Sequence, residues 1–249
     1  MVQELAPIRA RIGLIIPTSN RLTEPQFHRY APPGVVPHVT RLRMTGDYHA
    51  PVDELLPRVV EAAALLADAK CDILVFHCTG SSMRDGIAAE RRVIAAIEQA
   101  TGRRATSTAA AVLAALEAVG ARRLVHVSPS PSEHEVAFLE EAGFEVLRSR
   151  SLGLANSDAY IAAPPSQWLE AVQEEADPRA DAYFLACTNT HTPDVIEELE
   201  SRLGRPVVTS NQATLWYCLR VCGVPDDVPG FGQLGRLGLV ALAPQGARR

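Results

Sequence analysis

Two apolar segments of the chain end in the same pair of residues, a cysteine followed by a threonine. They read "DILVFHCT" at 72–79 and "DAYFLACT" at 181–188. A thiol at the end of a strand, just before a helix, lies near the positive end of the helix dipole and near free backbone N–H groups. Both lower its pKa and favour the thiolate. If Cys78 and Cys187 face one cleft, they could act on the two faces of one substrate carbon, one as nucleophile and the other as proton donor or acceptor.

Small polar residues follow these and other apolar runs. The groups are Thr18-Ser19-Asn20, Cys78-Thr79-Gly80-Ser81-Ser82, Ser128-Pro129-Ser130 and Cys187-Thr188-Asn189. Their hydroxyls and the N–H groups at helix starts can hold a carboxylate or a developing enolate. Ligands of open parallel α/β sheets bind beyond the carboxyl ends of the strands. We therefore expect a small carboxylate substrate to contact Asn20, Thr79, Gly80, Ser81, Ser130, Thr188 and Asn189.

Short apolar runs alternate with longer segments of helical spacing along most of the chain. The runs are continuous rather than alternating, which is typical of parallel strands covered on both faces. The pattern predicts an α/β fold with parallel sheets in Rossmann- or flavodoxin-like lobes. Strands are expected at 11–17, 35–44, 72–78, 123–129, 144–150, 182–187 and 206–210, and helices at 52–69, 88–102, 108–120, 132–143, 166–176, 192–204 and 213–223.

A weak internal repeat divides the chain. Residues 106–120 and 209–223 both begin with Thr-Ser and end with Gly, and each follows a Gly-Arg pair. The repeat predicts two pseudo-symmetric lobes, 8–117 and 118–225, with the active site in the cleft between them. The helix at 209–223 is expected to pack back on the first lobe. The tail, 226–249, is expected to add a final strand or to pack on a partner subunit.

The composition narrows the classes of function. The chain has 249 residues, and its net charge of -5 forms no long run, which argues against a nucleic-acid partner. No apolar stretch approaches the length of a membrane span, and the N-terminus lacks the pattern of a signal peptide. We expect a cytoplasmic protein whose five cysteines are free thiols. A homodimer or higher homo-oligomer is the default for such an enzyme.

The motifs resemble a known group of enzymes. Paired Cys-Thr strand ends in a duplicated α/β chain, with "PTSN" after the first strand, are similar to the aspartate/glutamate racemase superfamily. Within it, "IGLIIPTSN", "HCTG", "ACTN" and "TSNQATLW" look closest to the branch of maleate cis-trans isomerases and arylmalonate decarboxylases. The resemblance covers about residues 10–222, and "CTN" and "TSNQA" are its most specific pieces.

The resemblance implies a cofactor-independent isomerase of a small dicarboxylic acid. In the isomerases, the first-lobe cysteine adds to the substrate double bond, the central bond rotates and the thiol is expelled. Carried over, Cys78 is the nucleophile and Cys187 the proton donor and acceptor, and Asn20 and Asn156 match asparagines that bind substrate carboxylates. In the decarboxylases a glycine replaces the first cysteine, so the pair of cysteines here favours isomerase or racemase.

Two positions depart from the branch. It usually has Thr-Pro-Tyr after the first strand of the second lobe, with the tyrosine hydroxyl on the carboxylate, whereas this chain has Ser128-Pro129-Ser130. The serine is expected to leave a larger pocket and to remove a donor. Gly80 also stands where a serine is usual. A larger substrate or a different acid could therefore fit.

Several alternatives stay open at this stage. The same scaffold supports α-proton chemistry, namely racemisation of an amino acid or hydantoin, or decarboxylation of a substituted malonate. A non-catalytic small-carboxylate binding protein is a third interpretation, and Asn20 could simply cap a helix that starts near Thr23. His77 and Cys78 point to opposite faces of a strand, so His77 is expected to be a packed residue and no metal site is predicted. Cys71, Cys218 and Cys222 are expected to be structural.

Overall fold

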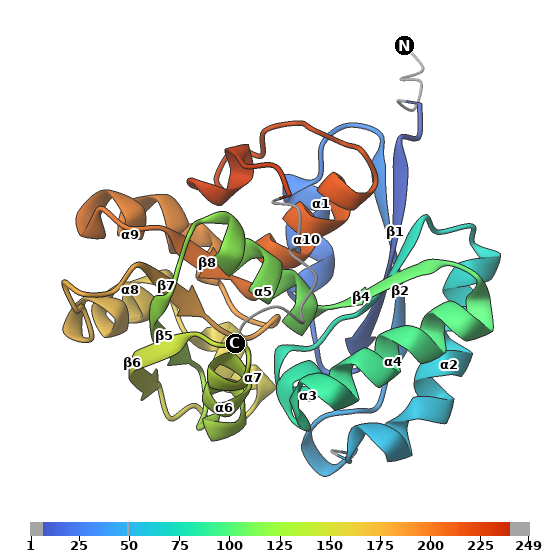
Figure 1. Ribbon diagram of the computed structural model, residues 1–249, viewed down its shortest axis with the longest axis horizontal. Coiled ribbons are helices and arrows are strands. Elements are labelled where there is room, and N and C mark those ends of the chain that lie inside the picture. The colour runs from blue at the N-terminus through green and yellow to red at the C-terminus, as the bar shows by residue number, and fades with distance from the viewer. Residues whose placement is uncertain (1–6, 49, 240–249) are drawn as a thin grey trace.

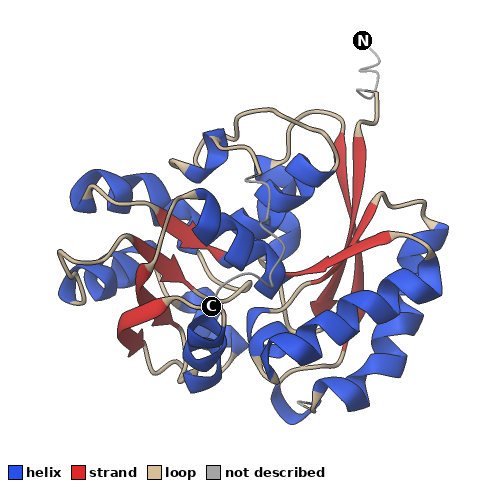
Figure 2. Cartoon of the chain, in the orientation of Figure 1, coloured by secondary structure: helices blue, strands red, loops and turns tan. Residues whose placement is uncertain are grey.

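A computed structural model describes residues 7–48 and 50–239, which form two parallel sheets with helices on both sides (Figures 1 and 2). The first sheet has the strand order β2-β1-β3-β4 and the second has the equivalent order β6-β5-β7-β8. Every neighbouring pair of strands is parallel. The strands are β1 (Ala10–Pro17), β2 (Val35–Leu42), β3 (Ile73–Phe76), β4 (Arg104–Ser107), β5 (Arg123–Ser128), β6 (Glu145–Ser151), β7 (Ala182–Leu185) and β8 (Val207–Thr209).

The helices cover both faces of each sheet. In the first lobe they are α1 (Thr23–Tyr30), α2 (Val52–Asp68), α3 (Thr79–Met83), α4 (Gly86–Thr101) and α5 (Thr108–Ala118). In the rest of the described chain they are α6 (Glu133–Glu141), α7 (Ser157–Ala162), α8 (Pro165–Glu174), α9 (Ile196–Leu203) and α10 (Ser210–Val221). Short 3-10 turns lie at Gly46–Tyr48 in the first lobe and at Thr192–Val195 and Leu234–Arg236 farther along the chain.

The predicted α/β fold with two pseudo-symmetric parallel-sheet lobes is confirmed. Each predicted strand and helix has a counterpart. The sequence pattern missed β4 and the short helices α3 and α7, and it gave α1 only as a helix that Asn20 could cap. The segment "RATS" of β4 is short and has three polar residues, so no apolar run marks it. It becomes a strand because it pairs with β3, Ile73 opposite Arg104 and Phe76 opposite Ser107. Tertiary pairing overrides a weak local preference at this edge.

A shared apolar core joins the two lobes. One face of each sheet packs with α5 and α10, and this core includes Ile12, Val75, Phe184 and Trp216. Figure 1 shows α5 and α10 between the two groups of strands. Helix α10 contacts α5 and α1 as well as β8. The start of α10 is therefore held against both lobes, and this placement determines what it can do at the cleft.

The start of α10 and the tail that follows it are fixed by polar contacts. Thr209 and Gln212 form a capping box, in which each side chain bonds the backbone N–H of the other residue. Farther along, Trp216 Nε1 donates to the carbonyl of Leu237 at 2.8 Å. No strand occurs at 226–239, and residues 240–249 of the predicted tail lie outside the described residues. None of the helices within the described ranges is both long and apolar enough to cross a membrane.

Each sheet has a topological switch point between its first and third strands in chain order. Strand β1 is followed by its neighbour on one side, and β3 then joins on the other side. Loops that leave two such strands diverge and open a crevice at their carboxyl ends. The loops after β1 and β3, and after β5 and β7, are those that carry the polar groups noted in the sequence. The helices α3 and α6 contact each other where the two crevices meet.

Candidate active site

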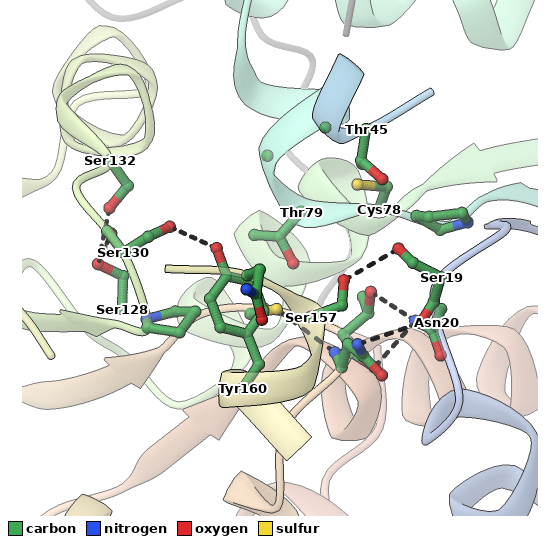
Figure 3. A pocket seen from close by; sticks show the side chains of 18 of the residues that line it. Ser19, Asn20, Thr45, Cys78, Thr79, Ser128, Ser130, Ser132, Ser157 and Tyr160 are labelled. Atoms are coloured by element: carbon green, nitrogen blue, oxygen red, sulfur yellow. Dashed lines mark hydrogen bonds between the residues drawn. The ribbon is translucent and has the colours of Figure 1, made fainter. Parts of the chain in front are cut away.

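The two crevices form one cavity of about 970 Å³, which is lined by both cysteines. Figure 3 shows its side chains, with Cys78 and Thr79 on one wall and Ser128, Ser130 and Ser132 on the other. The volume lies at the upper end of the usual range for small-molecule sites. Of the residues predicted to bind substrate, the cavity is lined by Asn20, Thr79, Gly80, Ser130, Asn156, Thr188 and Asn189.

Cys78 lies at the carboxyl end of β3, at the position that caps α3. It is 7% exposed. Burial raises the pKa of its thiol, although the hydroxyl and N–H of Ser81 and the N–H of Gly80 favour the thiolate. The predicted lowering of this pKa is therefore wrong. Helix α3 has only five residues, so its dipole is small and loss of water dominates.

Cys187 occupies the equivalent place after β7 and has an unusual backbone. Its φ is 89°, in the left-handed region that residues with a Cβ seldom adopt. The N–H of Asn189 points at its sulfur at 3.4 Å and favours the thiolate. Burial nevertheless raises the pKa of Cys187 to about 12, so the predicted lowering is wrong here too. At neutral pH Cys187 carries a proton that it can give to a bound substrate.

The peptide that follows Cys187 is held by a convergence of donors. The carbonyl oxygen of Thr188 accepts hydrogen bonds from Asn20 Nδ2 at 3.1 Å, Thr23 Oγ1 at 3.1 Å and Asn211 Nδ2 at 3.0 Å. A trans peptide is planar, so fixing this carbonyl also fixes the N–H of Asn189 on the opposite side. That N–H is the one aimed at the Cys187 sulfur. Hydrogen bonds to the carbonyl polarise the amide and strengthen the N–H as a donor.

Replacing Asn211 with alanine should therefore raise the pKa of Cys187 still further. One of three donors to the Thr188 carbonyl is lost, so the Asn189 N–H is held less firmly against the sulfur. We expect alkylation of Cys187 at pH 9 to slow about two- to tenfold, and the free energy of unfolding to fall by about 1–3 kcal/mol. Mass spectrometry of iodoacetamide-treated protein over a pH series measures the first effect.

The matched control for this experiment is Thr214→Val in the same helix. Thr214 is buried, and among the described residues its hydroxyl bonds only the carbonyl of Ser210, at 2.9 Å. This variant loses a buried hydrogen bond in α10 without touching the Thr188 peptide, so the alkylation profile of Cys187 should not move. An unchanged profile in Asn211→Ala as well would mean that the peptide is held without this donor.

Asn211 also binds His77, the residue before Cys78. His77 Nε2 lies 2.9 Å from Asn211 Oδ1, and Nδ1 lies 3.0 Å from Thr108 Oγ1. The ring is fully buried and meets Phe27 edge to face. Burial lowers the pKa of His77 to about 4. The structure places His77 as the packed histidine that the sequence predicted. Through Asn211 it links the neighbours of both cysteines.

The buried His77 should make the fold sensitive to mild acid. The unfolded chain protonates this histidine near pH 6.5, whereas the folded chain does so only near pH 4. The neutral, buried His77 therefore makes its full contribution to the free energy of unfolding above pH 6.5, and this contribution is lost as the pH falls toward 4. We expect a loss of about 2 kcal/mol of unfolding free energy between pH 7 and pH 5, measured by urea denaturation. His77→Gln should remove this slope, whereas His28→Gln, at an exposed histidine, should retain it.

The asparagines predicted to bind carboxylates both have local structural roles. Oδ1 of Asn20 accepts from the N–H of Thr23 at the start of α1, and its Nδ2 is engaged by Thr188. Oδ1 of Asn156 caps α7 through the N–H groups of Asp158 and Ala159. Asn156 is exposed and lines the cavity, and its Nδ2 donates to none of the described residues. The amide of Asn156 therefore remains able to meet a ligand, whereas that of Asn20 is already used.

Other predicted contacts differ in position. Ser81 does not line the cavity, because the first turn of α3 directs its side chain inward toward the carbonyl of Met44 at 3.4 Å and toward Cys78. The structure thus places Ser81 behind the cavity wall, in contact with Cys78. Thr79 lines the cavity, but its hydroxyl donates to Ser210 at 2.8 Å. Asn189 Oδ1 accepts from the N–H of Arg21 at 2.9 Å, which ties the two lobes together.

The sequence pattern missed a tyrosine in the cavity. The hydroxyl of Tyr160 donates to Ser130 Oγ at 3.0 Å, and Figure 3 shows the two side chains meeting across the site. The phenol thus lies near the position where a serine replaces the usual tyrosine, where it holds the Ser130 hydroxyl in place and occupies part of the expected extra space. Tyr160 is on α7, a helix that the pattern did not predict. His134 and Glu135 also line the cavity and were missed.

No group of three or more His, Cys, Asp or Glu side chains that could hold a metal ion occurs within 7–48 and 50–239. The arrangement instead offers two thiols, hydroxyl and amide donors, and the carboxyl groups of Glu135 and Asp158 in a single cavity. Such a set can add a thiol to a polarised double bond or move a proton at a carbon next to a carboxylate.

Comparisons with known proteins agree on one group. The family model described as arylmalonate decarboxylase matches residues 12–235. Arylmalonate decarboxylase of Bordetella bronchiseptica is 31% identical over 188 residues, which are 73% of this chain and 78% of that protein. Maleate isomerase of Nocardia farcinica is 28% identical over 239 residues, which are 91% of this chain and 95% of that protein.

The solved structures show the same fold. A mutant of Nocardia farcinica maleate cis-trans isomerase with a covalently bound succinylcysteine intermediate superposes with a TM-score of 0.83 at 26% identity. The match covers 91% of this chain and 98% of that one. The resemblance inferred from the motifs is confirmed. The chain belongs to the arylmalonate decarboxylase family, within the maleate isomerase and arylmalonate decarboxylase branch, and is an enzyme of that family.

Proposed function

We propose that this enzyme converts the double bond of a small unsaturated dicarboxylic acid from cis to trans without a cofactor. The observation that carries the proposal is the pair of thiols, Cys78 after β3 and Cys187 after β7, at equivalent strand ends of one cavity. A decarboxylase that only protonates a carbanion needs one of them. The succinylcysteine in the related Nocardia farcinica enzyme supports a thiol adduct as an intermediate.

The reaction divides the work between the cysteines. Cys78 reacts as the thiolate. Its Sγ bonds to one alkene carbon, and the π electrons move onto the neighbouring carbon and its carboxylate. The Cys187 thiol gives its proton to that carbon, which leaves a single bond that rotates. The Cys187 thiolate then takes the proton back, the double bond re-forms in the trans geometry and Cys78 leaves as the thiolate. No atoms are gained or lost overall.

The environments of the thiols support this assignment of roles. The pKa of Cys187, raised to about 12, keeps the proton on the acid. Burial raises the pKa of Cys78 as well, but the hydroxyl and N–H of Ser81 and the N–H of Gly80 oppose this rise and stabilise a thiolate nucleophile and a thiolate leaving group. For the carboxylate, we propose the hydroxyl of Ser130, which Tyr160 holds in place, and the amide of Asn156 as donors.

Proton NMR of the enzyme with maleate in deuterated buffer tests the proposal. We expect the maleate signal to decrease and the fumarate signal to appear although no cofactor is added to the sample. The same sample with phenylmalonate should release no carbon dioxide. Silence with maleate, together with formation of phenylacetate from phenylmalonate, would instead identify a decarboxylase.

Decarboxylation of a substituted malonate is the second candidate. It is favoured by the cavity volume of about 970 Å³, which exceeds what a four-carbon acid needs. In that reaction Cys187 alone would protonate the enediolate, and Cys78 would line the wall.

A further inference from the structure

The start of α6 places a carboxyl group in the cavity that the proposed reaction does not use. Glu135 lines the cavity, with 7% of its side chain exposed. It faces the loop that carries Cys78. A Cβ built on Gly80 would lie 3.9 Å from Glu135 Oε1 and 3.6 Å from Nε2 of His134. Glu135 Oε1 and His134 Nε2 therefore lie close to the same part of the cavity wall, beside Gly80 and the loop that carries Cys78.

The hydrogen bonds behind Glu135 determine which of its atoms is available. Oε2 lies 3.0 Å from His126 Nε2, and His126 Nδ1 lies 3.0 Å from Ser149 Oγ. All three groups are satisfied when Nε2–H donates to the carboxylate and the Ser149 hydroxyl donates to Nδ1. In this arrangement the imidazole of His126 holds Glu135 through Oε2. Within the described chain, Oε1 accepts no hydrogen bond and faces the cavity.

His134 supplies a second available atom beside it. Its Nε2 is buried and has no hydrogen-bond partner among the described residues. A buried nitrogen without a partner is costly unless a ligand completes it. The wall thus offers an acceptor, Glu135 Oε1, next to an imidazole nitrogen that can donate. A primary carboxamide carries the complementary pair, an N–H donor and a carbonyl acceptor.

The other charges of the cavity do not compensate for Glu135. Arg21 and Asp158 form an ion pair at its edge, where both side chains are largely exposed. No lysine, and no arginine other than Arg21, lines the described part of the cavity. A dianionic substrate would lose its hydration and place its second carboxylate close to that of Glu135, with no cation between them. The loss of water and the repulsion between the two negative charges both disfavour its binding. A monoanion avoids this cost.

We propose that the preferred substrate is the half-amide of the unsaturated dicarboxylic acid, with its carboxamide bound between Glu135 and His134 and its carboxylate on the opposite side of the cavity. The inference rests on the proposed isomerisation and narrows its substrate class. The covalent steps at Cys78 and Cys187 are unchanged. Glu135 acts on specificity and makes no bond to the reacting carbons.

Calorimetric titration with succinamate and succinate, two saturated analogues that cannot isomerise, tests the binding preference separately from turnover. We expect the enzyme to bind succinamate at least tenfold more tightly than succinate. Glu135→Gln should reduce this ratio about tenfold or more, because the charge that repels the diacid is gone. Glu133→Gln removes an exposed acid from the same turn of α6 and should leave the ratio unchanged.

Turnover of maleamate and maleate, followed by NMR, completes the test. We expect the half-amide to have the higher kcat/KM, and His134→Ala to reduce its advantage even if Glu135→Gln folds poorly. Equal or tighter binding of succinate, or a ratio that both variants leave unchanged, would overturn the inference. Turnover of maleate without any preference for the half-amide would contradict the inference alone. A preference in binding without turnover of either alkene would uphold it and contradict the proposed isomerisation.

Discussion

Cys78→Ala should abolish isomerisation of the cis acid, with kcat/KM lowered by about 10⁴-fold or more. Without Sγ no covalent adduct can form on the alkene carbon, so the central bond keeps its double-bond character and cannot rotate. The loss should appear in kcat and should not be recovered by raising the substrate concentration. The measurement is the rate of fumarate formation from maleate, or of the trans half-amide from maleamate.

The variant also separates the candidate reactions. If decarboxylation of a substituted malonate is the true activity, Cys187 alone delivers the proton, and Cys78→Ala should retain that activity within a few fold. Cys71→Ala is the matched control. Cys71 is a fully buried thiol in the same core cluster as Cys78, but it does not line the cavity. It should lower stability and leave turnover unchanged. Isomerisation at the wild-type rate in Cys78→Ala would rule out the thiol adduct.

The sequence pattern identified the elements that carry the site because strong local signals mark them. Continuous apolar runs predicted β1, β3, β5 and β7, and the echo between the two Cys-Thr pairs predicted that Cys78 and Cys187 hold equivalent places. The sheet order then brings the ends of these strands together at two switch points. These inferences require only the spacing of apolar residues, the lengths of the apolar runs and the order of the strands in the sheets.

The groups that adjust the chemistry could not be found in this way. Tyr160 meets Ser130 from 30 residues away, and Asn211 joins His77 to Thr188 across the two lobes. Such contacts depend on how α7 and α10 dock, and no local pattern specifies that. The direction of both thiol pKa shifts was wrong for a related reason. Helix position can be inferred from sequence, but the extent to which neighbouring segments exclude water from a strand end cannot.

The positive φ of Cys187 is another feature without a sequence signal. A glycine at this position would have indicated a positive φ, whereas a cysteine gives no such indication. The three donors that hold the Thr188 carbonyl explain how the strained residue is maintained. The same contacts direct the Asn189 N–H to the sulfur. Strain at this residue and the orientation of its thiol therefore have one structural cause.

Cys187→Ser should leave addition possible but block its reversal. In the proposed reaction the Cys187 thiolate removes the proton from the carbon beside the adduct before Cys78 can leave. A serine hydroxyl is a far weaker acid than the thiol, so the proton that completes the adduct comes from water, and serine forms no alkoxide at neutral pH that could remove this proton as the Cys187 thiolate does. We expect turnover to fall about 10²- to 10⁴-fold, the range for loss of a general acid or base. Protein incubated with the cis substrate should gain the mass of one substrate molecule, and peptide mapping should place it on Cys78.

This accumulation distinguishes the assigned roles from their exchange. If Cys187 were the nucleophile, Cys187→Ser would form no adduct, and Cys78→Ala would be the variant that retains bound substrate on Cys187. If both cysteines only moved protons, neither variant would gain mass. The raised pKa of Cys187 agrees with the first arrangement, because a thiol with a pKa of about 12 stays protonated where a nucleophile must ionise. Mass spectrometry of the two variants side by side therefore decides which thiol attacks and which one carries the proton.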